Sequence, residues 1–187
     1  MTLHFTLTTR RLELIPATLP MLTSERNRDY NELGRLTGAV IPPGWPPPLL
    51  DEGALDAFID LMTTGSDLRF CSWYWIRTGA LPTDRTLIGS GGTVSGAEAG
   101  DVLIGYSVLD GFQGQGYATE AVESIIHAVF ADRDVRRILA STFPHLKASI
   151  RVLEKCGFVP AGECHGNTGM EEGTLLFVRE RDASDTK

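Results

Sequence analysis

The residues best suited to chemistry lie in a glycine-rich segment near the middle of the chain, Gly105 to Ala121. A strand-like run ends near Leu109 and leads into a turn that contains Gly114 and Gly116, after which a helical pattern begins. Glycines lack the Cβ atom that would keep a ligand off the backbone, and the first amides of a helix have no partner within it. Such amides and the positive end of the helix dipole favour a pyrophosphate. The segment therefore predicts an anion cradle.

Other glycine-rich turns fit less well. A P-loop needs Lys and then Ser or Thr after its second glycine, whereas Tyr117 and Ala118 follow Gly116. A dinucleotide fingerprint needs a third glycine and an acidic residue about twenty positions on, but position 119 is Thr and the strand at 137–142 ends without an acid. A tight bend that binds nothing remains an alternative.

Two ordered motifs carry a resemblance to a known family. The spacing Gln113-x-x-Gly116-x-Ala118 after a strand resembles the CoA-pyrophosphate segment of the GNAT superfamily of acyl-CoA-dependent N-acetyltransferases. The stretch Ala148-Ser149-Ile150-Arg151-Val152-Leu153-Glu154-Lys155-Cys156-Gly157-Phe158 is similar to that family's A-S-x-R-V-L-E-K-x-G-F helix and turn. The resemblance is specific over about 87–162. Within the family, the motifs most resemble the branch that includes the enzymes acetylating N-terminal amines of ribosomal proteins.

The resemblance implies an α/β GNAT fold, with helices flanking a mixed sheet of six to seven strands whose central parallel pair splays apart to admit the CoA arm. It implies one such domain over residues 1–187. Hydrophobic periodicity and turn residues agree with that order. They predict strands at 11–15, 70–77, 86–94, 102–109, 137–142, 158–162 and 174–181, and helices at 51–65, 117–131 and 147–156. They also predict two short helices within 17–36, where Pro20 and Gly34 interrupt the helical pattern.

The resemblance also assigns acetyl-CoA as co-substrate and places its contacts. The backbone near Val108 and Leu109 would hydrogen-bond the pantetheine chain. The pyrophosphate would lie on Gln113, Gly114, Gln115, Gly116, Tyr117 and Ala118, with Thr119 at the edge. A neutral amine then attacks acetyl-CoA directly, which requires removal of a proton from the ammonium, polarisation of the carbonyl and protonation of the thiolate.

The catalytic groups are where the chain departs from its relatives. Leu103 stands where related enzymes often carry a Glu base, and Leu153 where some carry a Tyr acid. Leu146 replaces an Asn that the family favours near the cofactor arm. Ser149 is the candidate that hydrogen-bonds or protonates the thiolate; alternatively it caps or pads its helix. Candidate bases, each of which could equally be a solvated surface residue, are Asp101, Glu98, His145 and Glu163.

The acceptor site is predicted from aromatic residues on the side where the family admits its amine. Trp45 and Tyr74 are candidates for its walls, and the proline-rich loop at 42–48 is expected to close one end of the cleft. Because side chains alternate along a strand, Trp73 and Trp75 would face away from Tyr74 and belong to the core.

Composition limits the classes of partner. The 187-residue chain has a net charge of −7, which argues against nucleic acid and suits a cationic amine. It has no apolar run near the ~20 residues of a membrane helix, and the start of the chain resembles no secretory signal, so the cytoplasm is expected. Cys71, Cys156 and Cys164 lack metal-ligand spacing, so we expect no metal.

These observations favour an acetyl-CoA-dependent N-acetyltransferase (an acyltransferase) acting on a primary amine. The first expectation for that amine is a protein or peptide N-terminus, and the alternative is a small-molecule amine. Since the usual Glu and Tyr are missing, a protein that senses acyl-CoA without turnover is the alternative from another class. An exposed sheet edge or the apolar loop could support a homodimer.

Overall fold

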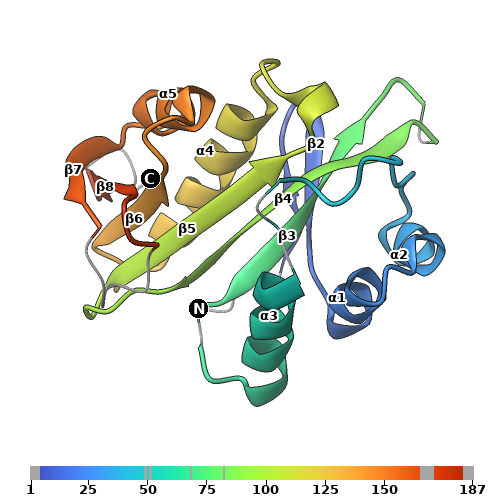
Figure 1. Cartoon of the computed structure of the whole chain (residues 1–187), viewed down its shortest axis with the longest axis horizontal. Helices are drawn as coiled ribbons and strands as arrows, with labels where there is room; N and C mark the ends of the chain where they lie inside the picture. Colours follow the sequence, from blue (N-terminus) through green and yellow to red (C-terminus); the bar gives the residue numbers. More distant parts are fainter. Residues whose placement is uncertain are drawn as a thin grey trace.

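A computed structural model describes residues 5–48, 50, 52–67, 69–81, 83–164 and 171–182 (Figure 1). Over these residues helices and strands alternate in a mixed α/β order. The strands are β1 (Leu7–Thr8), β2 (Leu12–Pro16), β3 (Cys71–Thr78), β4 (Arg85–Ser95), β5 (Asp101–Val108), β6 (Arg137–Thr142), β7 (Val159–Glu163) and β8 (Leu175–Glu180). The helices are α1 (Leu19–Arg26), α2 (Tyr30–Thr37), α3 (Glu52–Thr64), α4 (Tyr117–Phe130) and α5 (Lys147–Lys155), with a single 3₁₀ turn at Asp110–Phe112.

The strands form one mixed sheet in the order β1-β2-β3-β4-β5-β6-β8-β7. Its pairs are antiparallel except for β5 and β6, which run parallel and are joined through α4. The mixed sheet and the expected antiparallel meander from β3 to β5 are confirmed. The sheet has eight strands rather than six to seven, because Leu7 and Thr8 pair with β2. A two-residue strand has no period that a sequence could reveal.

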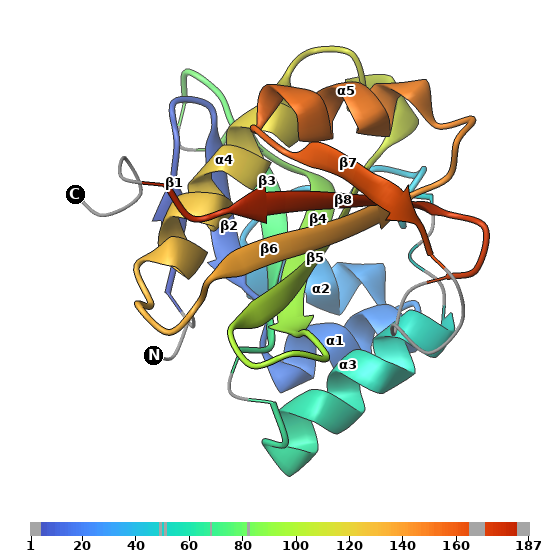
Figure 2. The same cartoon turned by 90° about the vertical axis from the view of Figure 1, so that its left-hand side faces the viewer.

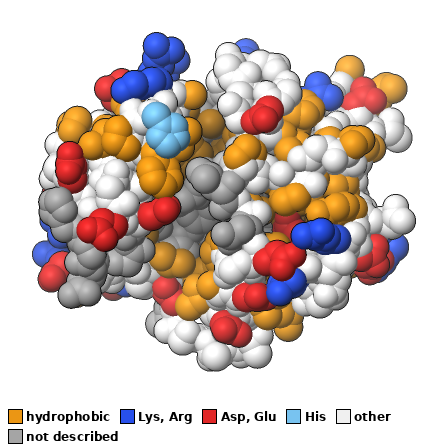
Figure 3. All heavy atoms as spheres, in the orientation of Figure 1, with side chains coloured by type: hydrophobic (Ala, Val, Ile, Leu, Met, Phe, Trp, Pro, Cys, Tyr) orange, Lys and Arg blue, Asp and Glu red, His pale blue; other side chains and the backbone are white. Residues whose placement is uncertain are grey.

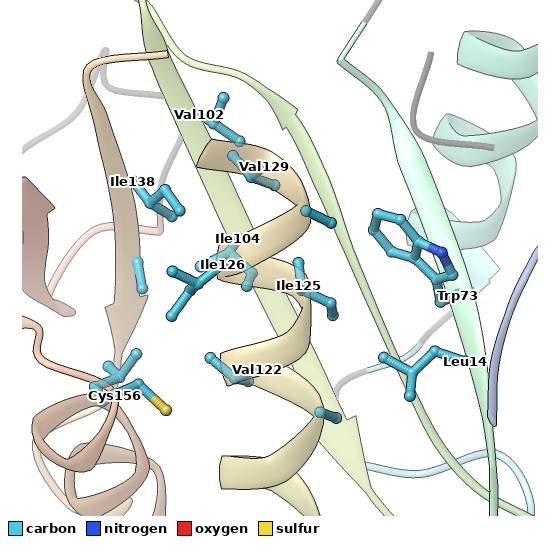
Figure 4. Packing of buried hydrophobic residues seen from close by; sticks show 14 of the residues in the cluster. Leu14, Trp73, Val102, Ile104, Val122, Ile125, Ile126, Val129, Ile138 and Cys156 are labelled. Atoms are coloured by element: carbon cyan, nitrogen blue, oxygen red, sulfur yellow. The ribbon is translucent and has the colours of Figure 1, made fainter. Parts of the chain in front are cut away.

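Helices cover both faces of the sheet (Figures 1 and 2). On one face α4 directs Val122, Ile125, Ile126 and Val129 at the sheet, forming the larger core with α5 beside it (Figure 4). On the other face α1, α2 and α3 form a second core. Alternation along β3 divides its aromatic side chains as expected: Trp73 and Trp75 lie in the first core and Tyr74 in the second.

The first two helices are separate, as predicted, but the break lies elsewhere than expected. Pro20 is in the first turn of α1, where its missing N–H costs nothing, and Gly34 is inside α2. The chain instead breaks at Asn27 to Asp29, where the Asp29 side chain accepts a hydrogen bond from the backbone N–H of Glu32 and caps α2.

The parallel pair at the centre of the sheet is joined at one end and open at the other. Pairing between β5 and β6 covers only 101–103 against 137–139. At the joined end the buried Asp101 carboxylate accepts two hydrogen bonds from the Arg137 guanidinium, at 2.7 and 2.8 Å. Beyond Leu103 no further β5–β6 pair occurs among the described residues. The predicted splay is therefore confirmed, and it leaves backbone groups unpaired along one edge of β5.

None of the helices in the described part of the chain is long and apolar enough to span a membrane. Cys71, Cys156 and Cys164 are all buried. Burial raises the pKa of the Cys71 thiol to about 12, which keeps it protonated and unreactive at neutral pH. Within the same described ranges, no three His, Cys, Asp or Glu side chains gather into a metal-binding group.

Candidate active site

A cavity of about 1040 Å³ opens where β5 and β6 separate. Its walls come from the end of β5, the turn that follows it, the start of α4, the end of β6 and one side of α5. The predicted cofactor residues that line it are Val108, Gln113, Gly114, Gly116, Tyr117, Ala118 and Thr119. The structure thus brings most of the predicted segment to one wall of one cavity.

The turn before α4 has the backbone shape of an anion cradle. Gly114 and Gly116 have φ angles of +72° and +82°, a region that side chains with a Cβ rarely adopt. A Cβ on Gly114 would meet no other atom within 4 Å, so the space above it is open. Gly116 caps α4 without a side-chain hydrogen bond, which leaves the first amides of the helix for a ligand.

Arg11, on the β1–β2 connection, fixes this turn from behind. Its guanidinium donates to the Gln115 carbonyl at 3.0 Å and lies 4.3 Å from the centre of the Tyr117 ring. It is itself held by Glu120 at 2.7 Å, whose other carboxylate oxygen accepts a hydrogen bond from the Thr9 hydroxyl. The turn is therefore positioned by contacts from the far end of the sequence.

Two of the predicted cofactor residues, Leu109 and Gln115, do not line this cavity. Leu109 is buried in the second core, and its N–H donates to the Ile88 carbonyl of β4. The side chain of Gln115 turns back to the Gly111 carbonyl. Since hydrogen-bonding direction alternates along an antiparallel ladder, the backbone groups of Tyr106 and Val108, rather than of Leu109, face the open edge. The Val108 carbonyl already accepts from the Gln113 side chain at 3.0 Å.

Three cations on α5 line the same cavity and were not recognised in the sequence. Lys147, Arg151 and Lys155 are four residues apart, and this spacing places them on one helix face. They bring local positive charge to the cavity of a chain whose net charge is −7. Over the face drawn in Figure 3, acidic and basic side chains are interspersed among hydrophobic ones. The positive charge at the cavity is therefore local to this face of α5. The i, i+4, i+8 spacing of the three cations is the sequence signal that could have revealed it.

Ser149 lies in the cavity wall and is close to one other hydroxyl. The Tyr106 hydroxyl donates to the Ser149 carbonyl at 3.4 Å and lies 3.5 Å from Ser149 Oγ. Burial raises the pKa of Tyr106 above that of an ordinary tyrosine, although the hydrogen bond to Ser149 acts in the opposite direction. Tyr106 thus stays a neutral hydroxyl. The sequence drew no attention to it, because a single Tyr on a strand usually belongs to the core.

A second, smaller cavity of about 390 Å³ meets the first at Gly105 and Tyr106. Its walls include Phe58 of α3, Phe70, Leu103 of β5 and Leu139 of β6, together with backbone and hydroxyl groups of β4. Glu171 lines both cavities. The large cationic cavity and the small, largely apolar one therefore share a boundary, called the passage below, that includes Gly105, Tyr106 and Glu171.

Trp45 and Tyr74, the predicted acceptor walls, lie together in the core and line neither of these two cavities. Their rings are 6.1 Å apart in the second core. The indole N–H of Trp45 and the hydroxyl of Tyr74 donate to the two carboxylate oxygens of Glu25, at 2.6 and 2.5 Å. Burial raises the pKa of Glu25, and these two hydrogen bonds partly offset it. Both rings can be buried because Glu25 accepts a hydrogen bond from the polar atom of each.

The proline-rich loop does reach the cavities. Pro48 lines the large cavity, and its carbonyl accepts a hydrogen bond from the Ser107 hydroxyl. Leu50 lines the small one. Trp45 anchors the loop through Glu25, so this aromatic residue positions the wall rather than forming it.

Of the predicted bases, only His145 lines a cavity, where it stacks on Phe143 beside α5. Asp101 is paired with Arg137 at the closed end of the splay. Glu98 and Glu163 are exposed and border neither cavity. The acid at the passage is instead Glu171, which comes from a connection between strands where sequence spacing gives no signal.

Comparison with known proteins agrees with this geometry. Residues 24–159 match the family model described as Acetyltransferase (GNAT) domain. A curated protein of Bacillus subtilis (strain 168), "Probable N-acetyltransferase YjcK", is 38% identical over 65 residues, which are 35% of this chain and 36% of that protein. The match thus spans about a third of the length of that curated relative.

Solved structures share the fold along nearly the whole chain. The ribosomal-protein-S5-alanine acetyltransferase from Vibrio fischeri is 18% identical, with a TM-score of 0.64 over 96% of this chain and 98% of that one. Mycobacterium smegmatis RimJ in complex with CoA-disulfide is 17% identical, with a TM-score of 0.63 over 95% of this chain and 88% of that one. At these identities the likeness shows the fold.

Proposed function

The chain belongs to the GNAT acetyltransferase family, and on that premise we propose that it transfers the acetyl group of acetyl-CoA to a primary amine, first of all the N-terminal amine of a protein or peptide. The observation that carries the proposal is the meeting of two unlike cavities at Gly105 and Tyr106. One suits a long anionic cofactor and the other a small acceptor. The whole of residues 1–187 would act as one acetyltransferase domain.

The large cavity fits CoA on two observations. The cradle at Gly114 and Gly116 offers open backbone amides to a pyrophosphate, and the α5 cations Lys147, Arg151 and Lys155 offer charge to the phosphates. The open edge of β5 offers the backbone groups of Val108 and Tyr106 to the pantetheine arm and to the thioester carbonyl.

Bound acetyl-CoA supplies a thioester carbonyl carbon that accepts the lone pair of a neutral amine and a sulfur that leaves as a thiolate. The acceptor first loses one proton from its ammonium to solvent. As the C–N bond forms and the C–S bond breaks, a second N–H proton is released and the sulfur gains one. Ser149, which lines the cavity beside the neutral Tyr106 hydroxyl, would donate a hydrogen bond to that sulfur.

The fold similarity supports a protein or peptide acceptor. The Vibrio fischeri protein is named as an enzyme of a ribosomal protein. An acceptor of that class would place the reaction in the cytoplasm. A small-molecule amine is the alternative acceptor.

Thermal unfolding with acetyl-CoA, CoA, NAD and ATP in parallel tests the cofactor class. A ligand at about one hundred times its Kd stabilises by roughly 2.7 kcal/mol, which raises the Tm of a chain of this length by roughly 5 to 10 °C. We expect that rise with acetyl-CoA and CoA only, followed by amine-dependent thiol release with a short peptide. An equal rise with NAD would overturn the proposal. A rise with CoA but no thiol release for any amine would identify an acyl-CoA sensor.

A further inference from the structure

The small cavity has a composition that selects among amines. Its walls are largely apolar, with Leu50, Phe58, Phe70 and Leu103 among them, and its polar groups are mostly neutral hydroxyls such as that of Ser90. Neutral hydroxyls can pair with an amide or another hydroxyl but cannot balance a full charge. The walls therefore favour an uncharged apolar body.

One charged side chain stands out in that lining. Among the described residues, Glu171 is the single charged group of the small cavity, and neither Lys nor Arg lines it. Glu171 also lines the large cavity, so this exposed residue lies on the boundary that the two cavities share. The cationic side chains Lys147, Arg151 and Lys155 are confined to the large cavity.

We propose that the acceptor is an amine whose only charge is its ammonium, carried on an apolar body without a carboxylate, and that Glu171 binds that ammonium at the passage. This inference rests on the proposed function and names its substrate class. The N-terminal residue of a peptide with an apolar side chain meets the description. A free amino acid brings a carboxylate with no cation to receive it, and a polyamine brings further ammonium groups with no further acid among the described walls.

Gly105 lies on the boundary between the two cavities and has no side chain. It lines both cavities, and a Cβ built on it would meet no other atom within 4 Å. Residue 105 therefore places no side chain between an ammonium held by Glu171 and the open edge of β5. After its proton passes to solvent, the nitrogen can attack as described above.

The test compares leucinamide with leucine, a pair that differs only in the carboxylate, and adds spermidine as a polycation. Initial rates at saturating acetyl-CoA are expected to give leucinamide a kcat/KM at least about tenfold above that of leucine or spermidine, since one unmatched charge costs at least a charge-assisted hydrogen bond. In Glu171→Gln the KM for leucinamide rises about tenfold, while kcat and the KM for acetyl-CoA stay within about twofold.

Glu172→Gln is the matched control, because Glu172 is the exposed neighbour and lines neither cavity. Its kinetics should equal those of the unchanged chain. Equal kcat/KM values for leucine and leucinamide, or equal effects of the Glu171 and Glu172 variants, would overturn the inference and leave the acetyltransferase intact. Absence of thiol release with every amine would overturn the proposed function itself, and the inference with it.

Discussion

The two cavities that meet at Gly105 are built in different ways. The large one is formed by backbone amides at the start of α4, the open edge of β5 and a cationic face of α5. The small one is formed by side chains from α3, β3, β4, β5 and β6 and from the loop that ends at Leu50. The large cavity thus combines local backbone with charges from one helix, whereas the small cavity gathers groups from segments that are far apart in the sequence.

The same contrast extends to how each cavity is supported. The cradle is held by consecutive residues and by the long-range contact from Arg11. The small cavity has Leu50 in its wall, just beyond the loop at 42–48, and that loop is anchored by Trp45, which donates a hydrogen bond to the buried Glu25. Substitutions in the cradle should therefore change the affinity for CoA. Substitutions that loosen the loop should change the free energy of unfolding and the kinetics with the amine acceptor.

The largest effect is expected from Glu25→Ala, which tests how the loop beside the small cavity is supported. It leaves the Trp45 indole N–H and the Tyr74 hydroxyl buried without an acceptor, at a cost of about 3 kcal/mol in the free energy of unfolding. Glu25→Gln is the control, since its amide can accept from one group and donate to the other. Urea unfolding of both variants measures the difference; a similar loss in both would contradict a hydrogen-bonding role.

The stability difference between the unchanged chain and Glu25→Gln should also depend on pH. Burial raises the pKa of Glu25, so the folded state holds this proton more tightly than the unfolded state does. Its contribution to stability therefore falls as pH rises from the unfolded pKa, about 4.3, through the raised folded pKa. Relative to Glu25→Gln, the unchanged chain should gain stability as the pH is lowered from 7 toward that value. Urea unfolding at pH 7 and 5 checks the sign.

Gly105→Val tests whether the cavities communicate. The added side chain has room in the fold but fills the passage, so we expect turnover to fall by about a hundredfold, close to the loss of a well-oriented attack. The Tm rise with CoA should persist. Gly111→Val is the control, because Gly111 also has open space and lines neither cavity. Unchanged turnover in Gly105→Val would mean that the amine does not pass this residue.

Gly116→Val alters the cradle in the large cavity and leaves the small cavity unchanged. A side chain at φ +82° is strained by about 1 to 2 kcal/mol, and relief of that strain would withdraw the amides of the cradle. The Kd for CoA, measured by calorimetry, should rise about tenfold, again with Gly111→Val as the control. An unaltered Kd would show that the pyrophosphate binds elsewhere.

Ser149→Ala separates chemistry from binding within the large cavity. Loss of the hydroxyl near Tyr106 should lower kcat about tenfold and leave the Kd for CoA within about twofold, since one neutral hydrogen bond to the sulfur is removed. An unchanged kcat would mean that Ser149 only pads the start of α5.

The smallest effect is expected from Arg151→Glu on the cationic face of α5. Exposed charges are partly screened, so the Kd for CoA should rise several-fold, by about 1 kcal/mol, and less in high salt. Arg133→Glu makes the same charge change on an exposed residue outside both cavities. Equal effects of the two variants would indicate general electrostatics rather than a site on α5.

The sequence by itself determined the order of strands and helices and the glycine-rich turn before α4. These features depend on short periods and on glycines within a few residues of one another, so the chain carries them locally. The splay of the parallel pair was expected from the family resemblance, and the structure confirms it. Only β1 was missed, because two residues show no period, and the break between α1 and α2 was misplaced, because a proline in a first turn does not end a helix.

The tertiary structure alone decided which side chains meet. It directs Leu109 into the second core and the Gln115 side chain to the Gly111 carbonyl, so neither lines the large cavity. It also buries Trp45 and Tyr74 against Glu25. It also brought Glu171, Tyr106 and the α5 cations to the cavities. The physical reason is that a buried polar atom must find its partner wherever the fold places one, and a wall built from distant segments leaves no spacing for a sequence to reveal.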